Sequence, residues 1–281
     1  MAVERIDRAD DPRLALYRDV GDGERMRARG LFVAEGRLVV KRAIEDRRYT
    51  IRSLLVNDAA LRDLAPALDR LDASVPVFAC RTGDFLQLTG FDLHRGCLAL
   101  VERPAATAVD HLIYRVQTLV VLEAVANADN VGGVFRNAAA FGADGVLLSP
   151  TCCDPLYRKA IRTSMGAALS VSFARVDAGD WPGVLTRVRA SGATIVALTP
   201  REPSEALDDF AVRWGQARRR LALLVGAEAS GLSPAVEAAA DYRVRIPISD
   251  RVDSLNLAVA TGIALQRIGS ASGERPRSPL G

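Results

Sequence analysis

Short apolar runs alternate with longer amphipathic segments along most of the chain. In the first part, apolar runs predict four strands, at 31–33, 51–56, 75–79 and 97–101. Apolar residues at helical spacing predict two helices there, at 35–47 and 59–71. This pattern indicates a small α/β unit.

The second part shows apolar runs that are almost continuous rather than alternating. They lie at 119–122, 146–148, 194–198, 221–225 and 242–246. Runs of this kind are typical of strands buried on both faces, so they predict a parallel sheet covered by helices. The predicted fold class is therefore α/β, with a larger parallel-sheet unit after a smaller one.

The length of 281 residues is typical of two domains. The expected boundaries are a flexible N-terminus at 1–24, a first unit at 25–103, a linker at 104–115, a second unit at 116–268 and a disordered tail at 269–281. The tail is rich in Gly, Ser, Pro and Arg, which favours disorder.

Composition excludes several classes of protein. No apolar run approaches the roughly 20 residues of a membrane helix, and the first residues lack the apolar core of a secretory signal. We therefore expect no membrane partner and a cytoplasmic location. The four cysteines show no CxxC pair, which favours buried reduced thiols over a zinc site, and the two histidines lie outside the motifs described next. No metal site is predicted.

Three polar, glycine-bearing motifs each begin where an apolar run ends. They read NVGGVFR at 130–136, VGAEASGL at 225–232 and IPISDRVDSLN at 246–256. Ligands bind at the carboxyl ends of parallel strands, so the motifs predict one composite active site. No GxGxxG follows the first strand of the second unit, and no GxxxxGK[ST] occurs, which disfavours Rossmann and P-loop enzymes.

Single residues of the motifs have two interpretations. Gly226 and Gly231 lie on either side of Glu228, and both would let a ligand approach the main chain. In the alternative interpretation, Gly226 only ends a strand and Gly231 only starts the next helix. Ser254 is placed to cap the helix that ends near 268, whereas Asn256 in its first turn is left for another role.

The first motif predicts a helix at 131–141. Asn130 is its expected N-cap, and Arg136 lies two turns inside. A cation there opposes the helix dipole, which favours a phosphate or carboxylate partner for Arg136.

Together the motifs resemble the SpoU family of RNA ribose methyltransferases in the SPOUT superfamily. The family pattern is met in order by Asn130, Gly132, Arg136, then Val225, Gly226, Glu228, Gly231, Leu232, then Ile246, Pro247, Ser254, Leu255 and Asn256. In the first unit, VAEGRLV at 33–39 and HRGCLA at 94–99 resemble the family's RNA substrate-binding domain. The chain departs from the pattern at Asp250, where glycine is usual, at Ala258, often serine, and at Ile248, commonly methionine.

The resemblance implies a trefoil-knot methyltransferase domain, a homodimer through that domain, and S-adenosylmethionine as cofactor. It implies methyl transfer to a ribose 2′-hydroxyl of structured RNA, either rRNA or tRNA. It assigns reaction roles to Arg136, Asn130, Ser254 and Asn256. The cofactor-binding residues that it implies are Thr199, Gly226, Glu228, Gly231, Ile246, Ile248 and Leu255.

Charge is unevenly distributed. The segment 24–52 holds nine basic and four acidic residues, although the whole chain carries a net charge of only +3. A basic face fits a phosphate backbone, but a solvated surface would have the same composition. The candidate RNA-binding residues are Arg37, Lys41 and Arg48, which fall near one predicted helical face, and Arg158, Lys159 and Arg162.

Two other function classes stay open. A non-catalytic RNA-binding protein could keep the fold without turnover, and titration with the cofactor would separate it from an enzyme. A small-molecule methyltransferase would not require the separate basic unit.

Overall fold

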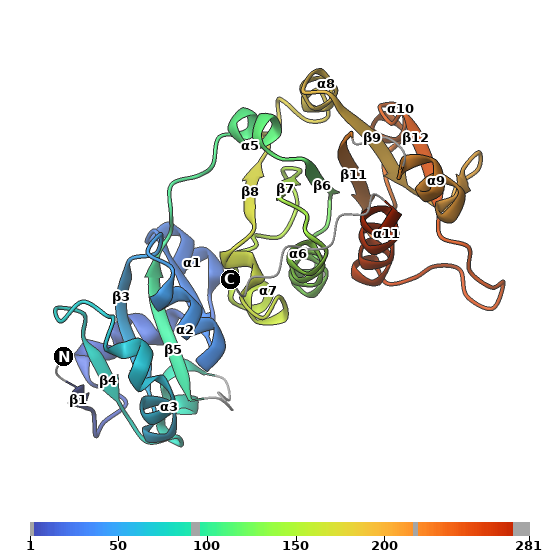
Figure 1. The fold of residues 1–281 in the computed structure, drawn as a ribbon. Coiled ribbons are helices and arrows are strands. Elements are labelled where there is room, and N and C mark those ends of the chain that lie inside the picture. Colours follow the sequence, from blue (N-terminus) through green and yellow to red (C-terminus); the bar gives the residue numbers. More distant parts are fainter. Residues whose placement is uncertain (1–2, 91–95, 216–218, 272–281) are drawn as a thin grey trace. The chain divides into compact units, whose positions relative to one another are not determined.

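The computed structural model describes residues 3–90, 96–215 and 219–271, and these form two compact units. The first comprises residues 1–105 with 156–169, and the second comprises 106–155 with 170–281. Each unit carries its own sheet (Figure 1). Of the expected tail at 269–281, residues up to 271 continue the last helix, and the rest lie outside the described residues.

The first unit is built on a mixed five-stranded sheet. Its strands are β1 (Val3–Arg5), β2 (Leu31–Glu35), β3 (Ile51–Val56), β4 (Val77–Ala79) and β5 (Cys97–Glu102), in the order β1-β4-β3-β5-β2. β5 runs antiparallel to β3 and β2, and the other pairs are parallel. Its helices are η1 (Pro12–Asp19), α1 (Gly23–Ala28), α2 (Arg37–Glu45), α3 (Asp58–Leu68), α4 (Asp84–Thr89), α7 (Arg158–Thr163) and η2 (Ala167–Leu169).

Residues 3–24 include a strand and a 3₁₀ helix that pack within the first unit, whereas the sequence predicted a flexible segment at 1–24. β1 pairs with β4, and the 3₁₀ helix η1 buries Leu14 and Tyr17 in the core. The Tyr17 hydroxyl shares a hydrogen bond of 2.8 Å with the Ser53 hydroxyl of β3. The sequence analysis missed these two core residues, because the apolar run at 14–17 is short and lies among many charged residues.

Residues 156–169 follow β7 in the chain but pack within the first unit. Glu35 forms ion pairs with Arg158 and Arg162 of α7, and Arg42 donates to the Met165 carbonyl at 2.8 Å. The Leu169 carbonyl accepts hydrogen bonds from the Tyr49 hydroxyl and the Arg48 guanidinium. This segment therefore belongs to the first unit by its contacts, although the sequence analysis placed it within 116–268.

The second unit is built on a parallel seven-stranded sheet. Its strands are β6 (Thr118–Glu123), β7 (Gly145–Leu148), β8 (Ser172–Arg175), β9 (Ala193–Leu198), β10 (Glu205–Ala206), β11 (Arg220–Gly226) and β12 (Tyr242–Arg245), in the order β10-β12-β9-β11-β6-β7-β8. The predicted parallel sheet is confirmed. Only β8 and β10 had no apolar signal, because β8 buries just Ala174 among its four residues and β10 has two residues.

Helices cover both faces of this sheet. They are α5 (Val109–Arg115), α6 (Ala128–Phe141), α8 (Val184–Ala190), α9 (Leu207–Trp214), α10 (Pro234–Ala238) and α11 (Leu257–Ala271). α5, α8 and α10 share one apolar core with the strands, and α6 and α11 lie side by side on the other face (Figure 1). Alternate strand residues therefore face two helical layers, which explains the continuous apolar runs.

Among the described residues, no helix is long and apolar enough to cross a membrane. The trefoil knot that the resemblance implies stays a prediction.

Candidate functional site

Side chains from all three motifs meet at the carboxyl ends of the strands of the second unit. The Asn256 amide donates to the Asn130 side-chain oxygen at 3.0 Å and to a Glu228 carboxylate oxygen at 2.8 Å. Asn130 is buried, with 6% of its surface exposed, whereas Glu228 is exposed. Asn256 is 126 positions from Asn130 and 28 from Glu228 in the chain, so the fold brings the three motifs into contact, and their role as one active site stays a prediction.

Both helix caps of the site differ from the sequence-based expectation. α6 begins at Ala128, and the Asn127 side chain caps it by accepting from the Asp129 amide at 2.8 Å. This places Asn130 inside the first turn, where its side chain is free to bind Asn256. α11 begins at Leu257, and Asn256 rather than Ser254 provides the cap.

Asn256 has two functions in one side chain. Its oxygen accepts from the amides of Ala258 and Val259 at 3.0 and 3.2 Å, while its nitrogen bridges to the other two motifs. A serine hydroxyl can cap a helix, but only an amide supplies an acceptor and two donors at fixed geometry. This explains asparagine at this position, and it leaves Ser254 exposed in the preceding loop.

The turn after β11 folds back tightly on itself. A Cβ atom added to Gly226 would lie 2.2 Å from the Gly231 carbonyl carbon, and the Gly231 amide donates to the Ala227 carbonyl at 2.8 Å. Gly231 has φ of +67°, a conformation that favours glycine. The chain's own backbone therefore requires Gly226, so the space beside it does not need a ligand to explain it.

Arg136 is exposed on α6 and makes no hydrogen bond or ion pair with any residue that the structure describes. Because α6 starts at Ala128, Arg136 lies in the second half of the helix, where the helix dipole does not disfavour a cation. The dipole argument for an anionic partner is therefore wrong. What remains is a guanidinium that is free to bind a ligand, on the same helix as Asn130.

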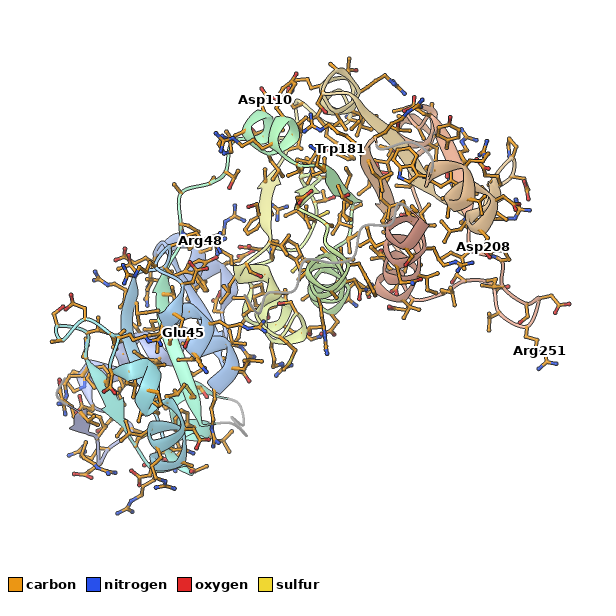
Figure 2. All side chains as sticks on the ribbon, viewed as in Figure 1. Glu45, Arg48, Asp110, Trp181, Asp208 and Arg251 are labelled. Atoms are coloured by element: carbon orange, nitrogen blue, oxygen red, sulfur yellow. The ribbon has the colours of Figure 1, made fainter. Side chains whose placement is uncertain are left out.

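The other predicted cofactor-binding residues differ in exposure. Ile246 and Leu255 are half-buried, and Ile248 is 40% exposed in the loop between β12 and α11. Figure 2 shows Arg251 in this loop, with its side chain pointing outward. Thr199 follows β9 and is buried, and its hydroxyl donates to the Glu237 carboxylate at 2.8 Å.

Sequence reasoning missed two buried carboxylates near these turns. Glu123, the last residue of β6, accepts from the Ser233 amide and hydroxyl, both at 2.7 Å, and from the Trp181 indole. Glu237 accepts from Thr199 and pairs with Arg201 at 3.4 Å. The sequence could have identified Glu123, because it directly follows the apolar run at 119–122, and a buried carboxylate needs hydrogen-bond donors around it.

The candidate RNA-binding residues lie in the first unit, and most have acidic partners. Arg37 pairs with Asp63, and Arg158 and Arg162 pair with Glu35. Lys159 lies half-buried on α7. Each of these arginines therefore already has a carboxylate partner within the unit.

Arg48 and Lys41 differ in whether they have an acidic partner. Arg48 lies beyond the end of α2 and not on its face, and it binds Asp46 at 2.6 Å, which lowers the pKa of that carboxyl below its usual value. Figure 2 marks Arg48 and Glu45, the last residue of α2. Lys41 is exposed on α2 and pairs with no residue that the structure describes. Lys41 is therefore the member of the predicted set with a free charge.

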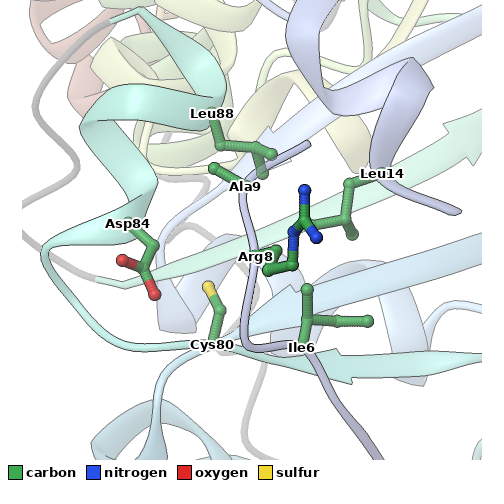
Figure 3. Close-up of a pocket in the computed structure, with 7 residues that line it drawn as sticks. All are labelled: Ile6, Arg8, Ala9, Leu14, Cys80, Asp84 and Leu88. Atoms are coloured by element: carbon green, nitrogen blue, oxygen red, sulfur yellow. The ribbon is translucent and has the colours of Figure 1, made fainter. Parts of the chain in front are cut away.

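The cysteines are thiols, as expected. Burial raises the pKa of Cys80 and of Cys97 to about 12, so both stay protonated at neutral pH. Within the described ranges, no group of three or more His, Cys, Asp or Glu side chains could hold a metal. A shallow hollow in the first unit has a mainly apolar lining that includes Cys80, Ile6 and Leu88 (Figure 3), and none of the three motifs contributes to it.

Comparison with known proteins agrees with this geometry. The SpoU rRNA methylase family model matches residues 117–266. An uncharacterized tRNA/rRNA methyltransferase of Mycobacterium tuberculosis is 38% identical over 266 residues, covering 93% of this chain and 90% of that protein.

Solved structures share the whole fold. The AdoMet-bound rRNA methyltransferase from Sinorhizobium meliloti superposes with a TM-score of 0.78 at 24% identity, covering 95% of this chain and 97% of that one. A structure described as an RNA 2′-O ribose methyltransferase has a TM-score of 0.75 at 23% identity, covering 96% of this chain and 100% of that one.

Proposed function

Since this chain belongs to the SpoU rRNA methylase family, we propose that it transfers a methyl group from S-adenosylmethionine to a ribose 2′-hydroxyl of structured rRNA or tRNA. The observation that carries the proposal is the meeting of Asn130, Glu228 and Asn256, together with Arg136, which lies on the same helix as Asn130 and is unpaired among the described residues. The reaction would take place in the cytoplasm, where these RNAs are found.

The residues at the strand ends fit the proposed cofactor. The turn at 226–232 presents main chain with no side chain at Gly226 and Gly231, and Ile246, Ile248 and Leu255 offer partly exposed apolar surface. Uncharged main-chain groups and apolar side chains suit an adenosyl group. When bound, S-adenosylmethionine supplies an electrophilic methyl group on a sulfonium. In this proposal Thr199, Gly226, Ile246, Ile248 and Leu255 hold it, and Glu228 and Gly231 shape the turn.

Arg136 binds the RNA in this proposal. Its guanidinium is a cation with several donors, so it anchors a substrate phosphate and stabilises the negative charge that develops on the 2′-oxygen. A phosphate oxygen or a transiently deprotonated Arg136 takes the hydroxyl proton. Asn130 and Asn256 join the N-terminal ends of α6 and α11 to each other, and Ser254 orients the ribose. Such positioning lowers a barrier by as much as roughly 7–11 kcal/mol.

RNA recognition by the first unit is part of the proposal. Lys41 offers a free charge on α2, whereas Arg37, Arg48, Arg158 and Arg162 would have to exchange or share their carboxylate partners. Giving up an exposed ion pair costs little, because such pairs contribute only about 0–1 kcal/mol, but the carboxylate that remains repels an approaching phosphate, whereas Lys41 has no such neighbour to give up among the described residues. Lys41 is therefore the first residue to test.

Homodimerisation through the second unit is also proposed. Val259 and Ile263 lie one turn apart on α11 and are 50% and 36% exposed, which leaves an apolar strip open to solvent. We expect Ile263→Glu to shift the protein toward the monomer in sedimentation equilibrium, with unchanged far-UV circular dichroism. A monomeric parent protein would contradict this part of the proposal.

The reaction is tested by incubating the full-length protein with labelled S-adenosylmethionine and deproteinised rRNA or tRNA, followed by digestion to nucleosides. We expect label in 2′-O-methyl nucleosides. Label in methylated bases would contradict the 2′-hydroxyl as the acceptor. RNA binding and cofactor binding without transfer would instead favour the non-catalytic alternative.

A further inference from the structure

We propose that Arg201 is a positioning residue that fixes the turn at 226–232 for the methyl donor, an inference that rests on the proposed cofactor site. The residue lies outside the three motifs, just after β9, and β9 pairs directly with β11, which leads into this turn.

The Arg201 guanidinium straddles Gly231. One terminal nitrogen donates to the Leu232 carbonyl at 2.9 Å, and the other donates to the Ser230 carbonyl at 2.7 Å. A planar fork with fixed donors can hold two carbonyls at once, which an ammonium group does less well. Arg201 therefore holds the main chain on both sides of the one residue with positive φ in the turn.

A buried carboxylate holds Arg201 in turn. Glu237 is 5% exposed, lies 3.4 Å from the guanidinium, and accepts the Thr199 hydroxyl at 2.8 Å. A buried charge is costly unless it is paired, so Glu237 favours the arginine conformation that reaches the turn. One network thus joins Thr199 at the end of β9 to the turn after β11.

The same network adds to the contacts that hold the turn. Within the turn, the Gly231 amide donates to the Ala227 carbonyl and Gly226 closely approaches Gly231, while Glu228 accepts hydrogen bonds from Asn256 and from the Leu257 amide of α11. Without Arg201, two carbonyls would turn to water and the turn would sample more conformations. Binding the cofactor would then carry the free-energy cost of ordering the turn, and this cost would reduce the affinity for the cofactor.

The test compares Arg201→Ala with Arg189→Ala in the full-length protein. Arg189 is a matched control because its side chain is 50% exposed against 47% for Arg201, and it also binds a carbonyl, that of Ala239, and a carboxylate, that of Asp241. The readouts are calorimetric titration with S-adenosylmethionine, amide hydrogen exchange at 227–232 without cofactor, and steady-state kinetics.

For Arg201→Ala we expect about tenfold weaker binding of S-adenosylmethionine, which corresponds to about 1.4 kcal/mol. We also expect faster exchange at 227–232 and a raised KM for the methyl donor with an unchanged KM for RNA. Arg201→Lys should recover only part of the affinity. Arg189→Ala should match the melting temperature of Arg201→Ala and leave all three readouts unchanged.

Two outcomes would overturn the inference in different ways. Equal cofactor affinity in Arg201→Ala and the unmodified protein would show that the turn does not need Arg201, while leaving the proposed function intact. If the unmodified protein itself fails to bind S-adenosylmethionine, the proposed function fails and this inference fails with it.

Discussion

Replacing Asn256 tests whether one amide both caps α11 and joins the three motifs. In Asn256→Ala the amides of Ala258 and Val259 lose their acceptor, which costs about 1 kcal/mol for a helix cap. The buried Asn130 oxygen also loses its donor, which costs about 1–3 kcal/mol. We therefore expect a loss of about 2–4 kcal/mol in the free energy of unfolding, or roughly 5–15 °C in Tm for a folded unit of this size.

Asn256→Asp separates the two functions. The introduced carboxylate keeps the acceptor for the helix amides and suits a helix N-terminus. It removes the donor and places a negative charge beside the Glu228 carboxylate, which lies 2.8 Å from the Asn256 nitrogen. We expect this variant to be destabilised at pH 7 despite its intact cap.

The pH dependence has a definite sign. Repulsion between the two carboxyls raises their pKa in the folded variant, so protonation favours the folded state. The deficit relative to the unmodified protein should therefore shrink as the pH falls. Urea unfolding between pH 4.5 and 8, followed by circular dichroism, measures this difference. An Asn256→Asp variant as stable as the unmodified protein at pH 7 would refute the bridging role, and an Asn256→Ala loss below about 1 kcal/mol would refute the reasoning on Asn130.

Three further predictions concern separate parts of the molecule. Gly226→Ala should lower the free energy of unfolding by about 1–3 kcal/mol, because the added Cβ would meet the Gly231 backbone. The control is Gly179→Ala, since Gly179 has open space around it. Equal urea midpoints for the two variants would contradict the prediction. Arg136→Ala should nearly abolish methyl transfer and keep cofactor affinity within a few-fold, and a collapse of calorimetric binding would disprove the assigned role. Lys41→Ala should reduce the salt slope of RNA binding by about 0.7–0.9, whereas an unchanged slope would show that α2 does not contact phosphates.

The sequence predicted the parts of the fold that depend on local burial. Strands such as β6 and β11 are apolar on both faces because helices cover the sheet on both sides, and this signal needs no knowledge of partners. β8 was missed because only one of its four residues is buried. An edge strand of this kind is fixed by its pairing with β7, which is a long-range contact.

The site was predictable in its members but not in their roles. The motifs identified Asn130, Glu228 and Asn256 as residues that share a site, and the structure brings them within hydrogen-bond distance. Which asparagine caps a helix depended on where each helix starts, and a shift of three residues at α6 moved Asn130 from the cap to the interior and removed the dipole argument for Arg136. Helix boundaries are the least certain part of a sequence-based prediction, so roles that depend on them were the ones that changed.

Arginines outside the motifs complete the physical picture of the site. Arg175 of β8 donates to four carbonyls between Ser149 and Cys153, Arg201 holds the turn at 226–232, and Arg245 binds the Ser204 carbonyl. Loops at strand ends leave carbonyls without partners in a ladder, and buried carbonyls must find donors. In this chain a guanidinium donates to main-chain carbonyls in each of these loops, so the geometry of the strand-end turns depends on residues that no short motif contains.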